Sequence, residues 1–145
     1  MKSVIGTCLL SALGVVGCAT SGVLTPAQQL QNSSLFEVRG HAMNMEAFLK
    51  SGKTEEEGIK VAVQSLTNGL KDPDSAKFRN VRMKTYDGLH IVCGEVNAKN
   101  SYGGYTGYKR FAAGPREASI ESFDGGRYAA LNAASNHGID SICGT

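Results

Sequence analysis

Three histidines are the residues of this chain best suited to acid–base or metal chemistry, and their surroundings support neither. His41, His90 and His137 stand far apart, and none lies in a His-Glu-x-x-His motif. A Gly-x-Ser-x-Gly nucleophile motif and a phosphate-cradling glycine loop are also missing from the sequence. Most carboxylates cluster at expected helix starts, where capping accounts for them. We therefore expect no catalysis, no bound metal and no cofactor.

The first of the functional cysteines stands near the N-terminus, after a short apolar stretch. Lys2 precedes residues 3–16, which are mainly apolar, and Val16-Gly17-Cys18 follows. A stretch of this length has the size of a signal-peptide core and is too short to cross a bilayer. Its end resembles the lipobox of bacterial lipoproteins, in which small and aliphatic residues precede an obligatory cysteine.

That resemblance implies removal of residues 1–17 and a diacylglyceryl thioether on Cys18, whose new N-terminus is also acylated. Several acyl chains anchor a protein where one would dissociate, since each buried methylene contributes about 0.8 kcal/mol. Ala19 follows the cysteine, where an Asp would resemble an inner-membrane retention signal. The sequence therefore favours the outer membrane, with the domain in the periplasm. The alternative is an ordinary secretory signal with a chance cysteine.

Two further cysteines, Cys93 and Cys143, remain after loss of the signal peptide, which would carry Cys8 away. In an oxidising envelope, two such thiols allow one intramolecular disulfide. A disulfide between Cys93 and Cys143 would close a long loop of the chain, which would stabilise a small domain by roughly 4 kcal/mol. The alternatives are a zinc site with His90 or His137, or a reactive thiol. Neither cysteine has a zinc-ligand spacing, so the sequence favours the disulfide.

The most distinctive segment combines aromatic, glycine and basic residues. Tyr102, Tyr105 and Tyr108 alternate with glycines, and Lys99 and Arg110 flank them. Tyrosine beside glycine and serine is typical of recognition loops, because it offers rigid contact area with a hydrogen-bonding tip. We predict that these five residues form a partner-binding surface, with Tyr102 projecting from the connection between two strands. The alternative is a purely structural turn in which one or two tyrosines cover the sheet.

Residues 70–111 also resemble small exported bacterial proteins of unassigned function. The shared features are a D-P-x-S-A-x-F helix and a V-C-G-x-V-N-x-K-N-x-x-G-G-Y-x-G-x-x-x-F hairpin. The resemblance implies a fold unit and no activity, and the N-terminal third and the tail lie outside it.

The charge balance limits the kinds of partner. The chain has 15 basic and 13 acidic residues, for a formal net charge of +2. Such near-neutrality argues against duplex DNA or an anionic lipid surface as the main partner. An RNA-binding reading of the tyrosines and basic residues conflicts with export as well, so we expect no nucleic acid.

The elements that would position these residues begin with helices. Residues 18–33 read as the lipidated cysteine and a tether, although Thr25-Pro26 could cap a short helix within it. Residues 35–48 are ambiguous. A capping box at Thr54 opens a clear helix, in which Ile59, Val63, Leu66 and Leu70 form one apolar stripe. A short helix follows Asp72-Pro73 and carries Ala76 and Phe78 inward.

After this helix the residue pattern becomes typical of strands, which we expect at residues 81–85, 90–97, 105–112 and 118–122. Tyr86-Asp87-Gly88 reads as a turn. For Glu95, a pairing with Lys109 or Arg110 across the hairpin accounts for the carboxylate as well as a catalytic use would. A last helix is predicted over residues 127–136, with Tyr128, Leu131 and Ala134 inward and Gly138 at its C-terminal cap position.

These elements predict an α+β fold over residues 34–145: N-terminal helices, an antiparallel meander of three to four strands, a C-terminal helix and one disulfide. For the function we expect an outer-membrane-anchored lipoprotein that binds a protein or envelope component. It reaches the membrane through the lipid on Cys18. The alternative is a periplasmic inhibitor or immunity-type protein directed against an envelope-attacking hydrolase or toxin.

Overall fold

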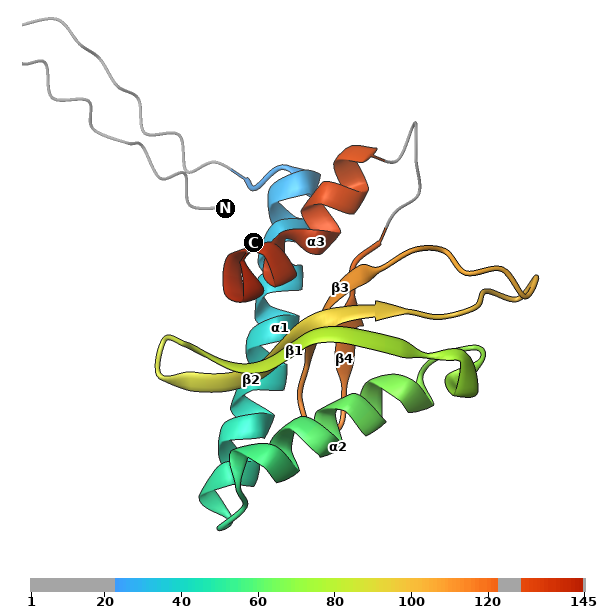
Figure 1. The fold of residues 1–145 in the computed structure, drawn as a ribbon. Coiled ribbons are helices and arrows are strands. Elements are labelled where there is room, and N and C mark those ends of the chain that lie inside the picture. The colour runs from blue at the N-terminus through green and yellow to red at the C-terminus, as the bar shows by residue number, and fades with distance from the viewer. Residues whose placement is uncertain (1–22, 123–128, 145) are drawn as a thin grey trace, which may run out of the picture.

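The computed structural model describes residues 23–122 and 129–144. These residues form an antiparallel sheet with helices on both sides (Figure 1). In chain order the elements are α1 (Pro26–Lys50), α2 (Glu55–Asn68), a 3-10 turn η1 (Pro73–Ser75), β1 (Lys77–Tyr86), β2 (Leu89–Asn97), β3 (Lys109–Ala113), β4 (Ala118–Ile120) and α3 (Ala129–Cys143).

The four strands pair antiparallel in the order β1-β2-β3-β4, which is the meander that the sequence predicts. With helices before and after the sheet, the α+β prediction is confirmed. The Asp87-Gly88 turn between β1 and β2 is confirmed as well, since both residues have positive φ (52° and 74°). Positive φ at both central positions is what a tight hairpin needs.

Two capping boxes fix where the first helices start. In each, a threonine side chain accepts from the backbone of the third helical residue, whose side chain bonds back to the threonine: Thr25 with Gln28 and Thr54 with Glu57. The Thr25 box opens a helix of 25 residues rather than a short one. Residues 26–33, which we had placed in the tether, are therefore helical, and α1 also absorbs the ambiguous residues 35–48.

The sheet has one apolar cluster on each face, and α1 contributes to both. On one face, Val38 and Ala42 of α1 pack with Cys93 of β2 and Ile139 of α3. On the other face, Met45 of α1 joins α2 and the strands through Ala62, Leu66, Val92, Val96, Phe111 and Ala113. A single long helix thus ties the α2 layer to the α3 layer.

The apolar stripe of α2 is only partly as expected. Leu66 is buried, and Ile59 and Leu70 pack against the cluster as half-buried residues. The closest packing falls instead on Gly58, where an added Cβ would lie 3.0 Å from Met45 Sδ and from Met83 Cε. The search for an apolar stripe considers apolar side chains, and glycine has no side chain. The sequence pattern therefore did not predict this contact.

The last helix differs from the prediction at its C-terminal end. α3 continues through Gly138 to Cys143, so Gly138 is not a cap. It is buried where α3 crosses α1, and an added Cβ would lie 2.3 Å from Ser34 O. Ala134 is buried as predicted, but Leu131 is half exposed. Tyr128 lies outside the described residues.

A bulge sets the geometry of β1, which starts earlier than the sequence predicts. Arg79 pairs with Glu95, but the next paired residue is Arg82, opposite Cys93. The bulged Asn80 has a φ of 54°. Gly94 lies opposite this bulge, and an added Cβ there would meet the Phe111 ring at 2.9 Å. The missing side chain at Gly94 therefore leaves the space that the Phe111 ring occupies.

Candidate functional site

The segment that connects β2 to β3, residues 98–108, is called the tyrosine loop below. Its first half is a folded turn organised by Asn100, whose Oδ1 accepts from the backbone N–H of Tyr102 (2.9 Å) and of Gly104 (3.1 Å). The Asn100 N–H also donates to Gly104 O at 2.9 Å. Gly103 adopts a φ of 80° in this turn, a conformation that favours glycine. The turn therefore presents Tyr102 from an ordered backbone.

Tyr102 is 97% exposed, in agreement with the expectation that it projects. Tyr105 and Tyr108 behave differently from the expectation. A strand over 105–112, as expected from the sequence, would send these two side chains to opposite faces because they are three residues apart, but β3 starts only at Lys109. Lys77 Nζ lies 4.7 Å from the Tyr105 ring centre, and Arg79 Cζ lies 3.9 Å from that of Tyr108.

Because Lys77 and Arg79 are two residues apart on β1, they point to the same face of the sheet. Tyr105 and Tyr108 therefore lie on one side of the molecule, each against a cation.

The tyrosine loop is also attached to the turn η1. The Lys99 N–H donates to Ser75 Oγ (2.9 Å), and the Tyr105 hydroxyl donates to Ser75 O (3.2 Å). Lys99 and Tyr105 form an isolated antiparallel bridge, and Lys99 Nζ lies 5.8 Å from the Tyr105 ring centre. These contacts hold the base of the loop, while Tyr102 at its tip stays open to solvent.

Arg110, which we placed on the partner-binding surface, is held by contacts to other parts of the fold. Its guanidinium bonds to Glu121 and, at 2.7 Å, to Asp140 of α3. Burial raises the pKa of Glu121, but the hydrogen bonds from Arg110 outweigh burial, so the pKa of this carboxyl lies below its usual value. Arg110 thus joins β3 to the segment after β4 and to α3, while Lys99 remains with the tyrosine loop.

The pairing considered for Glu95 also needs correction. Glu95 does lie opposite Arg110 in the sheet. Its carboxylate nevertheless accepts two hydrogen bonds from Arg79 (both 2.9 Å) and one from Asn80 (2.8 Å). These bonds from Arg79 and Asn80 lower the pKa of Glu95. Arg79 lies directly opposite Glu95 in the ladder between β1 and β2, and the bulged Asn80 follows it, so both donate to this carboxylate while Arg110 bonds to Glu121.

The sheet face that carries Cys93 and Glu95 is rich in cations. Cross-strand partners share a face, and the β1 residues opposite Asn97, Glu95, Cys93 and Ile91 are Lys77, Arg79, Arg82 and Lys84. Two residues of β1 lie between Arg79 and Arg82, where β2 has only one between their partners. Because of this extra residue, all four basic side chains stay on one side of the sheet. This cationic face, defined by those four residues, was missed in the sequence because the bulge breaks the period of two.

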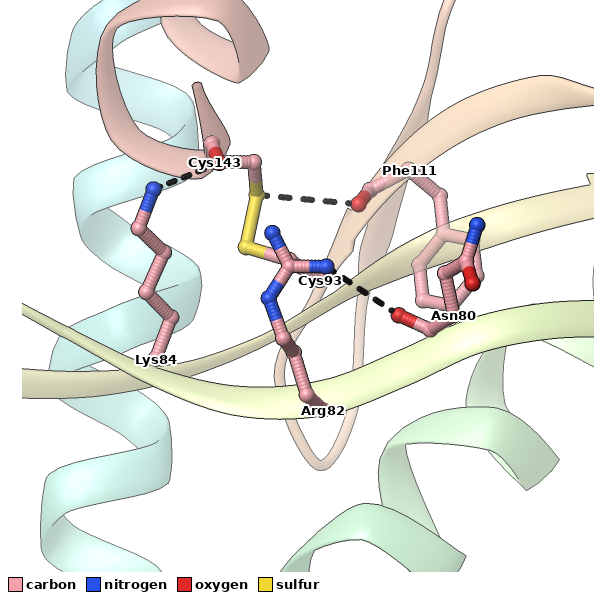
Figure 2. The surroundings of a disulfide bond; sticks show 6 residues. All are labelled: Asn80, Arg82, Lys84, Cys93, Phe111 and Cys143. Carbon is pink, nitrogen blue, oxygen red and sulfur yellow. Dashed lines mark hydrogen bonds between the residues drawn. A yellow bond between two sulfur atoms is a disulfide. The ribbon is translucent and has the colours of Figure 1, made fainter. Parts of the chain in front are cut away.

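A pocket of about 420 Å³ lies on the same face. Its lining combines two arginines, a carboxylate, an amide, the disulfide and two glycines: Arg82, Arg110, Glu95, Asn80, Cys93, Cys143, Gly94 and Gly144. Figure 2 shows Arg82 and Lys84 extending from β1 on the side of the disulfide. The Arg82 guanidinium donates to Asn80 O at 3.3 Å, and Lys84 Nζ donates to Cys143 O at 2.6 Å.

The predicted disulfide between Cys93 and Cys143 is present, with an S–S distance of 2.04 Å. It joins the middle of β2 to the end of α3, and both residues belong to the same apolar cluster. The two histidines that we weighed as zinc ligands lie elsewhere: His90 bonds to Glu46 (2.8 Å) and His137 contacts Ser141 (3.4 Å). Of the alternatives considered for these two cysteines, the structure therefore supports the disulfide rather than a zinc site or a reactive thiol.

The third histidine, His41, is buried on α1. Its Nε2 lies 2.9 Å from Ser119 Oγ, which donates to Glu37, and its Nδ1 lies 3.7 Å from a Glu117 carboxylate oxygen without a hydrogen bond. Burial lowers the pKa of His41, against the opposing charges of Glu37 and Glu117. Since a carboxylate can only accept, Ser119 gives its proton to Glu37 and receives one from His41. The serine is therefore not arranged as a nucleophile activated by this histidine.

Comparison with protein-family models, curated proteins and solved structures found no match for this chain. Cys18 lies outside the described residues, so its lipidation remains a sequence prediction. Among residues 23–122 and 129–144, no helix is long and apolar enough to cross a membrane.

Proposed function

We propose that this chain is an outer-membrane-anchored lipoprotein that acts as a binding or accessory module in the cell envelope, without catalysis. The observation that carries the binding function is the position of Tyr102. This side chain is 97% exposed on a turn whose backbone is held by Asn100. A large aromatic side chain that contacts solvent on an ordered turn loses little conformational entropy when a partner covers it.

The neighbouring tyrosines support the same proposal. Tyr105 and Tyr108 are 43% and 37% exposed, and each keeps one side open while a cation lies against the ring. Aromatic and arginine side chains are enriched among the residues that dominate binding energy. Together with Lys99, they give a mixed aromatic and basic surface, which suits a protein partner.

The proposed anchor limits where this surface can act. Between Cys18 and the first residue of α1, Pro26, the chain can extend over at most about 28 Å. A protein lipidated at Cys18 would therefore hold its domain close to the membrane surface. This short reach favours a partner at or near the inner surface of the outer membrane.

The anchor is tested by Cys18→Ser. We expect the variant to leave the outer-membrane fraction and to keep its signal peptide, because the thioether is a precondition of cleavage in proteins with a lipobox. If the variant is cleaved normally and still sediments with outer membrane, the lipoprotein assignment is wrong.

The binding surface is tested by Tyr102→Ala with Phe36→Ala as the matched control. Phe36 is also a highly exposed aromatic residue, 80% exposed, but it lies on α1. We expect chemical cross-links to a partner in intact cells to fall with Tyr102→Ala and to persist with Phe36→Ala. Truncating a residue that anchors an interface typically costs about 2 kcal/mol or more of binding free energy. Equal cross-linking in the two variants would contradict the proposal.

A second function, inhibition of an envelope-attacking hydrolase or toxin, is favoured by one observation. The tyrosine loop extends away from the helices (Figure 1), and its base is held by Ser75. A projecting, pre-ordered loop can enter an active site at a small entropic cost. The test is a challenge of purified hydrolases with the protein. Dose-dependent inhibition that Tyr102→Ala abolishes would favour this function over that of an accessory module.

A further inference from the structure

The pocket beside the disulfide differs from the tyrosine loop in its chemistry, because it contains a guanidinium without a carboxylate partner. On the cationic face, Arg79 is paired with Glu95. Arg110, which lies opposite Glu95 on β3, is paired with Glu121 and Asp140. Arg82 has no such partner within residues 23–122 and 129–144. Its only hydrogen bond there is a long one to Asn80 O, at 3.3 Å.

Arg82 therefore keeps most of its hydrogen-bonding capacity. A guanidinium has five N–H donors in a planar fork that matches the two oxygens of a carboxylate. Because Arg82 lines a pocket of about 420 Å³, an anionic group that enters the pocket can meet this fork. The volume is large enough for one or two amino-acid side chains with the backbone between them.

We propose that this pocket binds a carboxylate of an acidic polypeptide segment, through a two-pronged hydrogen bond from Arg82. The inference rests on the proposed binding function and names the chemistry of the partner. A singly charged carboxylate fits better than a phosphate, since Glu95 is also part of the lining and would repel a second negative charge. The rest of the lining is largely the disulfide and glycine backbone, which suits a short apolar stem.

The source of the carboxylate is a polypeptide because one side chain, Arg79, contacts both the pocket lining and the tyrosine loop. Arg79 joins the two, since its guanidinium stacks on Tyr108 and also bonds to Glu95 at the pocket. Arg79 and Arg82 lie opposite Glu95 and Cys93, which are two residues apart on β2 and hence roughly 6.5 Å apart, the spacing of alternate residues in an extended peptide. An acidic segment that passes along β1 can thus contact Tyr108 and Arg82 together.

The experiment measures binding of short fluorescent peptides to the purified full chain in detergent, by fluorescence anisotropy. One peptide alternates Glu and Ser and has an amidated C-terminus. Another alternates Gln and Ser and ends in a free carboxylate. A third alternates Lys and Ser and has an amidated C-terminus. We expect one or both carboxylate peptides to bind and the Lys peptide not to bind. The first two distinguish a side-chain carboxylate from a C-terminal one.

The decisive variants are Arg82→Gln and the control Arg116→Gln, which removes an exposed charge between β3 and β4. We expect Arg82→Gln to weaken binding about tenfold and Arg116→Gln to change it less than twofold, given the strength of charged hydrogen bonds. Arg82→Lys keeps the charge but not the fork, so it should recover only part of the affinity. Thermal melts of all variants check that each is folded.

Three results would overturn the inference: no binding of either carboxylate peptide, equal weakening by Arg82→Gln and Arg116→Gln, or displacement by inorganic phosphate as effective as by glutamate at equal ionic strength. These results are independent of the cross-links at Tyr102. A pocket that fails this test leaves the tyrosine loop as the binding surface, and a loop that fails leaves the peptide measurement unaffected.

Discussion

Individual side chains in this protein stabilise the fold through contacts that reach across the sheet. Arg110 illustrates this, because it lies near the start of β3 yet bonds to Glu121 after β4 and to Asp140 on α3. Glu121 is only 7% exposed, so its charge depends on Arg110 for compensation. Residues that the sequence presents as part of a recognition loop are thereby used for the fold.

At this scale we predict the effect of Glu121→Gln. The change leaves Arg110 with Asp140 alone and removes a charged acceptor from a half-buried guanidinium. We expect a loss of roughly 1–3 kcal/mol in the free energy of unfolding, the range for a lost charged hydrogen bond. Chemical denaturation is the measurement, with Glu56→Gln on the exposed first turn of α2 as the control. A loss no larger than that of the control would show that Arg110 and Glu121 are not coupled.

Glycines decide how closely the elements pack, and α1 and α3 form the clearest case. Gly138 of α3 lies against the backbone of Ser34, while Gly40 of α1 has nothing within 4 Å of an added Cβ. Both are glycines in the interior of a helix. They should nevertheless respond in opposite ways to the same substitution.

We predict that Gly138→Ala destabilises the protein and that Gly40→Ala stabilises it. The first change forces α1 and α3 apart, with a cost of about 1–3 kcal/mol for overpacking. The second removes the conformational cost of a helical glycine, a gain of about 0.5–1 kcal/mol. Thermal melts of the two variants test this. Similar shifts in the same direction would contradict the close approach of the helices at Gly138.

The sequence predicts those parts of the elements that depend on neighbouring residues. The caps at Thr25 and Thr54 and the Asp87-Gly88 turn were all visible, because each is made by residues within a few positions of one another. The Cys93–Cys143 disulfide could be found by elimination. The role of Gly138 and the bulge at Asn80 could not be found, because both depend on contacts between residues distant in sequence.

The candidate site follows the same rule. Exposure of Tyr102 could be predicted from its place in a connection rich in glycine. The facing of Tyr105 and Tyr108 could not, because the strand starts four residues later than its composition indicates. The cationic face was hidden for a similar reason: Arg79 and Arg82 seem to point to opposite faces until the bulge is taken into account.

For the whole molecule, stability comes from two clusters tied together by α1 and from the disulfide. Reduction, or Cys93→Ala with Cys143→Ala, opens a loop whose ends are 50 residues apart in the sequence. We predict a loss of about 4 kcal/mol in the free energy of unfolding. Denaturation of the oxidised and reduced forms measures it. Equal stability of the two forms would mean that the disulfide is not formed in the folded protein.

The folded protein should also lose stability in mild acid because of His41. Burial lowers the pKa of this histidine below 6.5, so the unfolded chain binds a proton at His41 more tightly than the folded protein does. Stability is then complete above about pH 6.5, falls as the pH drops through that value, and levels off below the folded pKa. Glu37 and Glu117 limit the effect, since their charges favour the protonated ring.

The pH dependence is tested by melts of His41→Gln and of the control His137→Gln between pH 7.5 and pH 5. We expect the decline in melting temperature to be shallower in His41→Gln than in the unmodified protein and unchanged in the control. The same decline in all three proteins would assign the effect to other groups.

We propose above all that the tyrosine loop is the surface through which this protein binds a partner in the envelope. The most direct measurement places a photoreactive amino acid at Tyr102, or at Phe36 as the control, and irradiates intact cells. We predict a discrete cross-linked species from position 102 that is missing from position 36 and depends on Cys18. Cross-links of equal yield and pattern from both positions, or none from position 102, would contradict the claim.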